Sequence, residues 1–210
     1  MKVLPILLAA AAVGLTAGTI KNTKHDLSST GPGAKTNTTQ VCVFCHTPHG
    51  SATAANQVIP LWNKTTSSSA GFTMYASTTL QGAVDATPTG ASMACFTCHD
   101  GTLAVGAMIN LPNDAATISY TAGGGVNATG FIASGTALLG KDLSNDHPVS
   151  ITYPATDPGL VAVASLPATV KLFSGKVQCA SCHDVHDNTN APFLRVSMVN
   201  SALCTTCHLK

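Results

Sequence analysis

The chain has 210 residues, enough for one domain or two small ones. Only 9% of the residues are charged, all nine acids are Asp, and the formal net charge is +1. This balance excludes the basic surface of a nucleic-acid-binding protein and the charge-rich helices of a coiled coil. A hydrophobic content of 45% excludes disorder caused by charge.

The first segment has the pattern of a secretory signal peptide. Lys2 precedes an apolar run from Val3 to Val13, and Leu15-Thr16-Ala17 offers a small-residue cleavage site. The run is shorter than the roughly 18 residues that a membrane span needs, and the later apolar stretches, Leu103–Leu111 and Gly159–Val170, are also too short. The sequence therefore predicts an exported protein with a signal peptide at 1–17, a mature domain at 18–210 and no membrane span.

The mature chain contains four copies of the pattern C-x-x-C-H, which together hold all eight cysteines. We number them motif 1 (Cys42, Cys45, His46), motif 2 (Cys95, Cys98, His99), motif 3 (Cys179, Cys182, His183) and motif 4 (Cys204, Cys207, His208). The pattern is typical of c-type haem attachment, because two thiols add to the haem vinyl groups and the histidine ligates the iron. We expect four covalently bound haem c groups.

The segments between the motifs show few signs of regular structure. Residues 28–40 and 65–70 are rich in Ser, Thr and Gly, and Gly123–Gly125 interrupts the long middle segment, which we expect to be loops with a small hairpin. Alternation over Val149–Tyr153 predicts a short strand. Each motif is expected to begin a helix of one or two turns, and motifs 3 and 4 to form a tight pair.

These features predict a mostly irregular, loop-rich fold with short α-helices, few short β-strands and a core built from haem. About 193 mature residues over four haems leave roughly 48 residues per haem, too few for an ample protein core. The chain without haem should therefore be unfolded.

Two other interpretations of the cysteines remain open. Paired C-x-x-C units can form four-thiolate zinc sites, and an exported chain with eight cysteines can be a disulfide scaffold. Neither explains why a histidine follows the second cysteine in all four copies.

The remaining histidines match the need for one distal iron ligand per motif; they are His25, His49, His147 and His186. His49 and His186 each follow a motif histidine by three residues. Such a short segment cannot pass around a haem to its other face, so we expect each of these two to reach a neighbouring haem. The methionines are interpreted as packing residues: Met74, Met93, Met108 and Met198.

Two imidazoles on every iron would leave no coordination site for a substrate. The sequence therefore favours electron transfer over iron-centred catalysis, and we expect that the protein is not an enzyme. Transient electron carriers usually dock through charged patches, which this chain can scarcely form. A nearly uncharged surface favours permanent assembly.

The chain resembles the multihaem c-type cytochromes, and in particular the OmcE-type tetrahaem cytochromes of metal-reducing bacteria. The resemblance rests on residues 24–28 (KHDLS), 42–49 (CVFCHTPH) and 146–150 (DHPVS), and on the closing haem pair. It implies a head-to-tail homopolymer, an extracellular conductive filament in which one distal histidine comes from a neighbouring subunit. His25, on the N-terminal arm, is the candidate for that role.

Three hypotheses follow from these patterns. The first is a filament at the cell surface or outside the cell that passes electrons from partner cytochromes to external acceptors. The second is a soluble periplasmic tetrahaem carrier with all eight ligands in one chain. The third is a multihaem reductase with one open iron.

Overall fold

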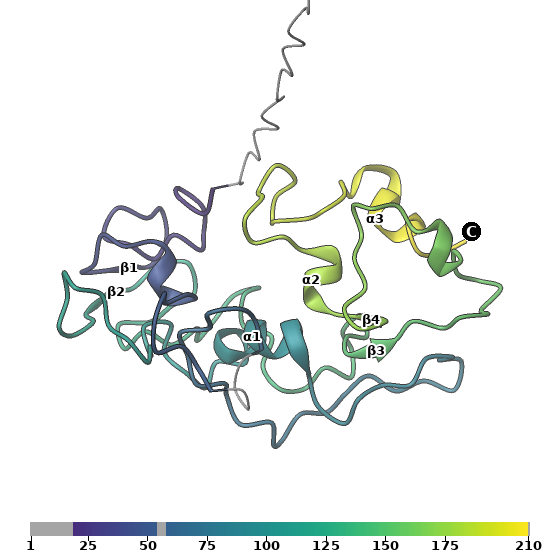
Figure 1. Cartoon of the computed structure of the whole chain (residues 1–210), viewed down its shortest axis with the longest axis horizontal. Coiled ribbons are helices and arrows are strands. Elements are labelled where there is room, and N and C mark those ends of the chain that lie inside the picture. The colour runs from purple at the N-terminus through teal and green to yellow at the C-terminus, as the bar shows by residue number, and fades with distance from the viewer. Residues whose placement is uncertain (1–18, 54–57, 210) are drawn as a thin grey trace, which may run out of the picture.

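The computed structural model describes residues 19–53 and 58–209, so the predicted signal peptide lies outside the described residues. Figure 1 shows long loops joined by very short elements, as the sequence predicts. The helices are η1 (Cys42–Phe44), α1 (Gly90–His99), η2 (Val163–Ser165), α2 (Cys179–Cys182), η3 (Val199–Ser201) and α3 (Ala202–Thr205); the strands are β1 (Lys35–Thr36), β2 (Tyr120–Thr121), β3 (Ile151–Thr152) and β4 (Lys176–Val177). None of these helices is long and apolar enough to cross a membrane.

Two antiparallel ribbons tie together segments that are distant in the sequence. Strand β1 pairs with β2, with Lys35 opposite Thr121, and β3 pairs with β4, with Ile151 opposite Val177. The strand predicted over 149–153 is reduced to two residues, because Ser150 adopts a left-handed φ of 56° that interrupts an extended conformation. At the predicted middle hairpin, Gly123 and Val126 form a single bridge.

The buried apolar residues form two small clusters instead of one continuous core. The first contains Ala34, Val105, Val126 and Ile132, and the second contains Ala52, Trp62 and Ala94. Partly buried cysteines border both clusters: Cys98 packs on the first and Cys45 on the second. So little packed protein is consistent with the expectation of a core completed by haem.

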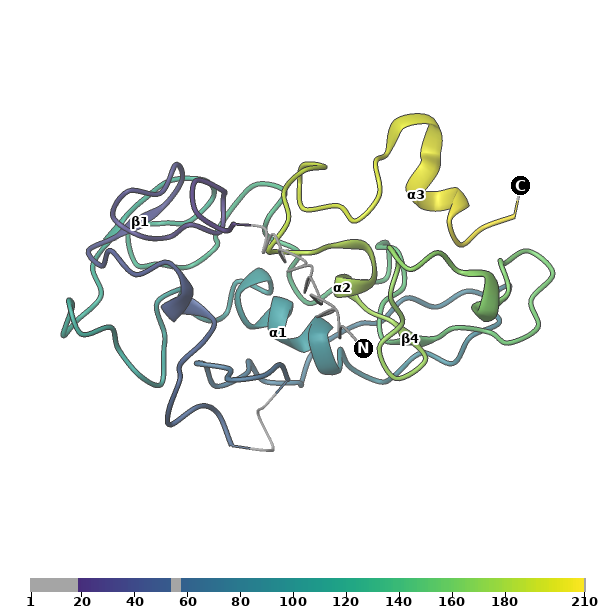
Figure 2. The same cartoon turned by 45° about the horizontal axis from the view of Figure 1, so that its top comes forward.

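Helix α1 is the only helix among the described residues that exceeds two turns, and it carries motif 2 at its C-terminal end. The prediction that every motif begins a helix is therefore wrong for motif 2 and also for motif 4, since α3 begins at Ala202. By contrast, Cys42 begins η1 and Cys179 begins α2. The motif 2 helix begins earlier because Met93, Ala94 and Phe96 are buried and anchor it. Figures 1 and 2 show α1 in the middle of the molecule, close to α2.

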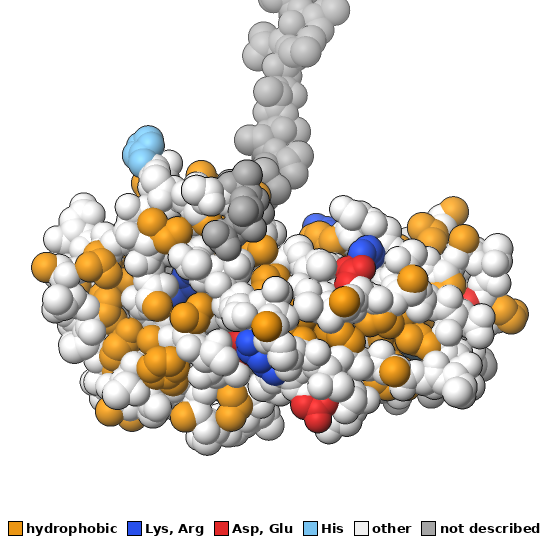
Figure 3. Space-filling model, turned by 90° about the horizontal axis from the view of Figure 1, so that it is seen from below, with side chains coloured by type: hydrophobic (Ala, Val, Ile, Leu, Met, Phe, Trp, Pro, Cys, Tyr) orange, Lys and Arg blue, Asp and Glu red, His pale blue; other side chains and the backbone are white. Residues whose placement is uncertain are grey.

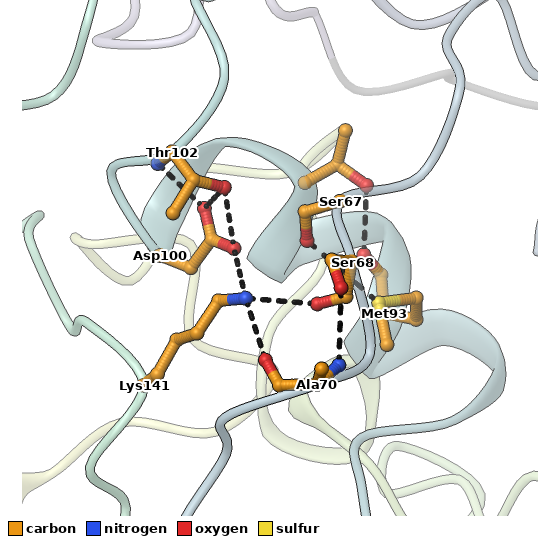
Figure 4. Close-up of polar contacts among 8 residues, drawn as sticks. Ser67, Ser68, Ala70, Met93, Asp100, Thr102 and Lys141 are labelled. Carbon is orange, nitrogen blue, oxygen red and sulfur yellow. Dashed lines mark hydrogen bonds and ion pairs between the residues drawn. The ribbon is translucent and has the colours of Figure 1, made fainter.

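A lysine fixes the end of α1 against the loop that precedes it. Lys141 Nζ donates hydrogen bonds to the carbonyl oxygens of Ser68 and Ala70, at 2.9 Å each, and lies 4.0 Å from Asp100 Oδ2 (Figure 4). The same ammonium group lies 5.0 Å from the ring centre of Phe72. Since Asp100 directly follows the motif 2 histidine, these contacts hold that motif in place.

Charged side chains are sparse on the molecular surface. The face drawn in Figure 3 consists mostly of backbone and uncharged side chains with scattered hydrophobic groups, and only isolated Lys, Arg and Asp groups lie among them. This pattern agrees with a composition of 9% charged residues. Encounter with a partner protein cannot rely on a large patch of one sign on this face.

Candidate haem-binding site

One helical turn gives each C-x-x-C-H motif its geometry. Residues i, i+3 and i+4 of a helix share one face, and these are the positions of the two cysteines and the histidine. In motif 1 the His46 amide donates to the Cys42 carbonyl at 2.9 Å. The corresponding distances are 3.0 Å in motif 3 and 2.9 Å in motif 4. Each motif thus presents two thiols and an imidazole on one side.

Backbone carbonyls orient three of the four motif histidines through their Nδ1 atoms. His46 Nδ1 lies 3.0 Å from the Pro60 carbonyl oxygen, and His99 Nδ1 lies 2.7 Å from that of Ala137. His183 Nδ1 is 3.0 Å from the carbonyl oxygen of residue 192. Since a carbonyl oxygen only accepts, Nδ1 is the donor, and in the neutral ring Nε2 then keeps a free lone pair. This is the usual arrangement of a metal-ligating histidine.

Six of the eight histidines form three ring pairs, each joining a motif histidine to one of the four others. The ring centroids are 6.3 Å apart for His46 and His186, 6.0 Å for His99 and His25, and 6.3 Å for His208 and His147. Two metal–nitrogen bonds of about 2 Å, with about 1.2 Å from each nitrogen to its ring centre, separate two imidazoles on opposite sides of a metal by about 6.4 Å. The spacing therefore fits an iron atom between each pair.

His186 faces the histidine of motif 1 although it follows motif 3 by three residues, so it does not pair with His183. Its Nδ1 lies 3.6 Å from Asp184 Oδ1, and the other oxygen of that carboxylate accepts a hydrogen bond of 2.9 Å from Arg195. The only arginine of the chain thus holds the loop that carries His186.

The remaining two histidines, His49 and His183, form no ring pair within the described chain, although His183 lies near enough to His25 to contribute to the lowering of its pKa. Both are exposed, and neither ring contacts another aromatic ring in the structure. Every histidine of the sequence lies within the described residues, so this leaves one motif histidine and one candidate distal histidine unmatched.

His25 faces a histidine of its own chain in this structure, whereas the sequence suggested it as the ligand from a neighbouring subunit. Its ring faces His99 and stacks on Phe193 with a centroid distance of 4.7 Å and an interplanar angle of 15°. Burial, followed by the nearby positive charge of His99, lowers the pKa of His25 to about 4. The ring is therefore neutral at pH 7, as a metal ligand must be.

The cysteines of consecutive motifs approach one another. The Cys95 thiol donates to the sulfur of Cys179, which raises the pKa of Cys95 and lowers that of Cys179. Cys98 of motif 2 lies close enough to Cys45 of motif 1 to add to the effect of burial, which raises the pKa of Cys45 to about 11. Motifs 1, 2 and 3 are therefore neighbours in space.

Motif 4 approaches the others through motif 3. Burial raises the pKa of the Cys182 thiol, and Cys207 and Cys204 raise it further. The predicted proximity of the last two motifs thus appears as closeness of their sulfur atoms. His147, which faces His208, comes from the loop that leads into β3.

The two alternative uses of the cysteines find no support in this geometry. All eight cysteines are free thiols. Within residues 19–53 and 58–209, no three His, Cys or Asp side chains converge as they would around a zinc ion. Covalent haem fits better, because each motif carries two thiols beside an imidazole and three imidazoles face a second one at ligand spacing.

Sequence reasoning found the histidines and cysteines but missed the groups that orient them. The carbonyl oxygens come from Pro60, Ala137 and Pro192. These residues lie 14, 38 and 9 positions after the histidines that they orient, so the spacing follows no common pattern. No sequence signal marks a backbone carbonyl. The stacking of Phe193 on His25 was also missed, although an isolated aromatic residue in a chain with 5% aromatics was a possible signal.

The comparison with protein families agrees with this geometry at the C-terminal end. Residues 172–210, which contain motifs 3 and 4, match a family described as a doubled CXXCH motif. No curated protein gives a significant match. The doubled motif indicates a multihaem c-type cytochrome with covalently attached haem. Its C-x-x-C-H motifs indicate haem-binding electron transfer.

Proposed function

We propose that the protein carries four haem c groups, one per motif, and is the subunit of an extracellular filament that passes electrons to external acceptors. The observation that supports this proposal most strongly is the pair of histidines left without a partner. The resemblance to OmcE-type cytochromes and the scarcity of surface charge support it as well. The route out of the cell is export directed by residues 1–17.

Bound haem supplies an iron that gains or loses one electron without making or breaking a bond. The thiols of each motif would anchor one group, and the motif histidines with His25, His147 and His186 would ligate the iron. With His25, His147 and His186 as distal ligands, motifs 2, 4 and 1 have no position left for a substrate. We therefore propose a carrier of electrons and not an enzyme.

Motif 3 lacks a second imidazole within its own chain, and His49 lacks a motif. We propose that His49 of one subunit ligates the iron held by His183 of the next. The surface that carries His49 then differs from the surface around His183 to which it binds. The contact is therefore heterologous and can repeat along a chain of subunits without closing into a ring. An open filament follows, in which every iron has two imidazoles.

The surroundings of His49 suit a contact with another subunit. Leu61, Ile109 and Leu111 are between 44% and 47% exposed, and we call these three residues the His49 patch. Asn110 connects the patch to His49, because its Nδ2 donates to the His49 carbonyl oxygen at 3.2 Å. Clustered exposed apolar side chains are typical of protein–protein contacts.

The test compares His49→Ala with His25→Ala in protein recovered from cells and medium. We expect His49→Ala to keep four haems by mass spectrometry, to show one iron that binds CO, and to form no filaments in negative-stain electron micrographs. His25→Ala is the matched control, because it removes a distal ligand that faces its own chain. It should also show one CO-binding iron but should still form filaments.

The outcomes separate the alternatives. Filaments from His49→Ala would contradict ligation across the subunit boundary. Native protein that stays monomeric in the periplasmic fraction, with all four irons low-spin, would favour the soluble carrier. A native protein with one iron open in every assembly state would favour a reductase.

A further inference from the structure

Lys64 is a buried cation, and no carboxylate lies within ion-pair distance of it in the described chain. Its side chain is among the most deeply buried of the molecule, with 2% of the residue exposed. The Nζ atom donates hydrogen bonds to the carbonyl oxygens of Val105, at 2.6 Å, and Ala107, at 3.2 Å. Burying an ammonium group without an opposite charge is unfavourable, so such residues are uncommon unless the charge has a use.

The segment that carries Lys64 passes between motifs 1 and 2. The Asn63 amide donates to the carbonyl oxygen of Cys45 at 2.9 Å. Val105, which accepts the hydrogen bond from Lys64, belongs to the apolar cluster on which Cys98 packs. The ammonium group therefore lies between the attachment cysteines of two different haems.

The positive charge of Lys64 has no close counter-charge beside motifs 1 and 2. The carboxylate that directly follows motif 2, Asp100, lies 4.0 Å from the Lys141 ammonium, which reduces its influence. The Lys64 ammonium itself is held at a buried position by neutral carbonyl oxygens, so its charge is weakly screened. A net positive potential is therefore expected where the haems of motifs 1 and 2 would be attached.

We propose that Lys64 raises the reduction potentials of the haems held by motifs 1 and 2. The inference rests on the proposed loading of the motifs with haem c. Reduction adds one electron to a ferric iron and breaks no bond, so a fixed positive charge nearby favours the ferrous state. The charge does not act equally on motif 4, whose sulfur atoms lie beside motif 3. Lys64 therefore gives the haems of motifs 1 and 2 higher reduction potentials than the haem of motif 4.

The test is a spectroelectrochemical titration of the haem-loaded native protein and three variants, with the electrode as the electron source. Lys64→Gln removes the charge but keeps an N–H donor for the two carbonyl oxygens, and Lys64→Arg keeps the charge. Lys35→Met removes an exposed charge from β1 and is the control. We expect Lys64→Gln to shift two of the four ferric–ferrous equilibria toward ferric by about tenfold each, equivalent to about 59 mV. Lys64→Arg and Lys35→Met should leave all four near their native values.

Haem content measured by mass spectrometry separates the two levels of the proposal. A native protein with fewer than four haems would contradict the proposed function. Four haems in Lys64→Gln with unchanged potentials, or with four equal shifts, would overturn the role of Lys64 alone. If Lys64→Gln does not accumulate, the proposal is tested by the order in which the haems of the native protein are reduced. The irons of motifs 1 and 2 should take up the first two electrons, and earlier reduction of the motif 4 iron overturns the proposal.

Discussion

Asp114 fixes the residues that lead into motif 1. Its carboxylate accepts hydrogen bonds from the Thr38 hydroxyl, at 2.5 Å, and from the Thr39 amide and hydroxyl, at 2.8 and 2.7 Å. These hydrogen bonds lower the pKa of Asp114 from 3.8 to about 2, the Thr38 hydroxyl making the largest contribution. The carboxylate form is thus favoured by the folded chain.

Stability should depend on this carboxylate only above a defined pH. Because the folded pKa is lower than the unfolded one, the contribution is complete above pH 3.8 and is lost as the pH falls toward 2. We expect Asp114→Asn to lower the thermal midpoint of the holoprotein at pH 6 and to differ little from the native protein at pH 2. Asp157→Asn, which removes an exposed carboxylate bonded within its own turn, is the control. An equal difference at both pH values would contradict the assignment.

At the level of single residues, the sequence identifies the cysteines and histidines that can bind haem but not which histidines pair. The motif spacing identifies the thiols and imidazoles, which the structure brings to one side of a helical turn. The count of spare histidines, however, contains no information on pairing. His25 was assigned to a neighbouring subunit because it lies on an N-terminal arm, and it instead packs against Phe193. Pairing depends on contacts between segments more than 60 residues apart in the sequence.

Between elements, buried hydroxyl groups join α1 to α2 and so set the position of motif 2 relative to motif 3. Ser92 Oγ accepts a hydrogen bond of 2.9 Å from the Cys179 amide. Ser150 Oγ accepts one of 2.9 Å from the Thr89 amide at the start of α1 and donates one of 3.0 Å to Gln178 Oε1, directly before α2. Ser92 and Ser150 are both fully buried. Thiol contact between the two motifs depends on this junction.

Removing one hydroxyl from the junction should weaken the whole molecule. Ser92→Ala improves helix propensity but leaves the Cys179 amide buried without an acceptor, so we expect a loss of about 1–3 kcal/mol in the free energy of unfolding. Chemical denaturation of the holoprotein measures it. Thr97→Val is the control, because the Thr97 hydroxyl only donates back to the Met93 carbonyl oxygen of the same helix. Equal losses in the two variants would show that the junction contributes nothing specific.

The element scale also shows where sequence patterns were insufficient. Loops and short helices were predicted because Ser, Thr and Gly are abundant and helix-forming charged residues are scarce. The length of α1 was not predicted, since residues 90–94 show no strong helical pattern and are helical because Met93 and Ala94 are buried by other segments. The ribbons β1–β2 and β3–β4 are too short to leave a pattern in the sequence.

For the whole molecule, the four motifs should not be equally important for folding. Helix α1, which carries motif 2, has five buried residues, whereas α3 at motif 4 has none. We expect Cys204→Ala/Cys207→Ala to accumulate as a folded protein with three haems. Cys95→Ala/Cys98→Ala should not accumulate, because a haem attached beside the central helix would complete the core. Haem staining, intact mass and limited proteolysis measure the result. Comparable yields of the two double variants would contradict a central role for motif 2.

Burial of the cysteines predicts the order in which haem attachment and folding occur. Burial raises the pKa of Cys45, Cys98 and Cys182, and a thiol is a poor nucleophile when its pKa is raised. Thioether bonds should therefore form before these cysteines are enclosed. The overall fold class followed from composition and motif number, but the arrangement of the motifs did not, because it is set by long-range contacts that surround the haems.

Motif 3 is the junction of a small network. Motif 1 is connected to it twice, directly by His186 and indirectly through motif 2, whereas motif 4 is adjacent to motif 3. If electron transfer through motif 2 is slow, electrons can still pass between motifs 1 and 3 directly. Every electron-transfer route to motif 4, however, passes through motif 3. The same motif holds His183, whose second ligand is proposed to come from the next subunit. Under that proposal, binding of a neighbouring subunit completes the ligands of motif 3, which every electron route to motif 4 must cross. A single subunit would then lack one iron ligand at this junction, and assembly into a filament would supply it.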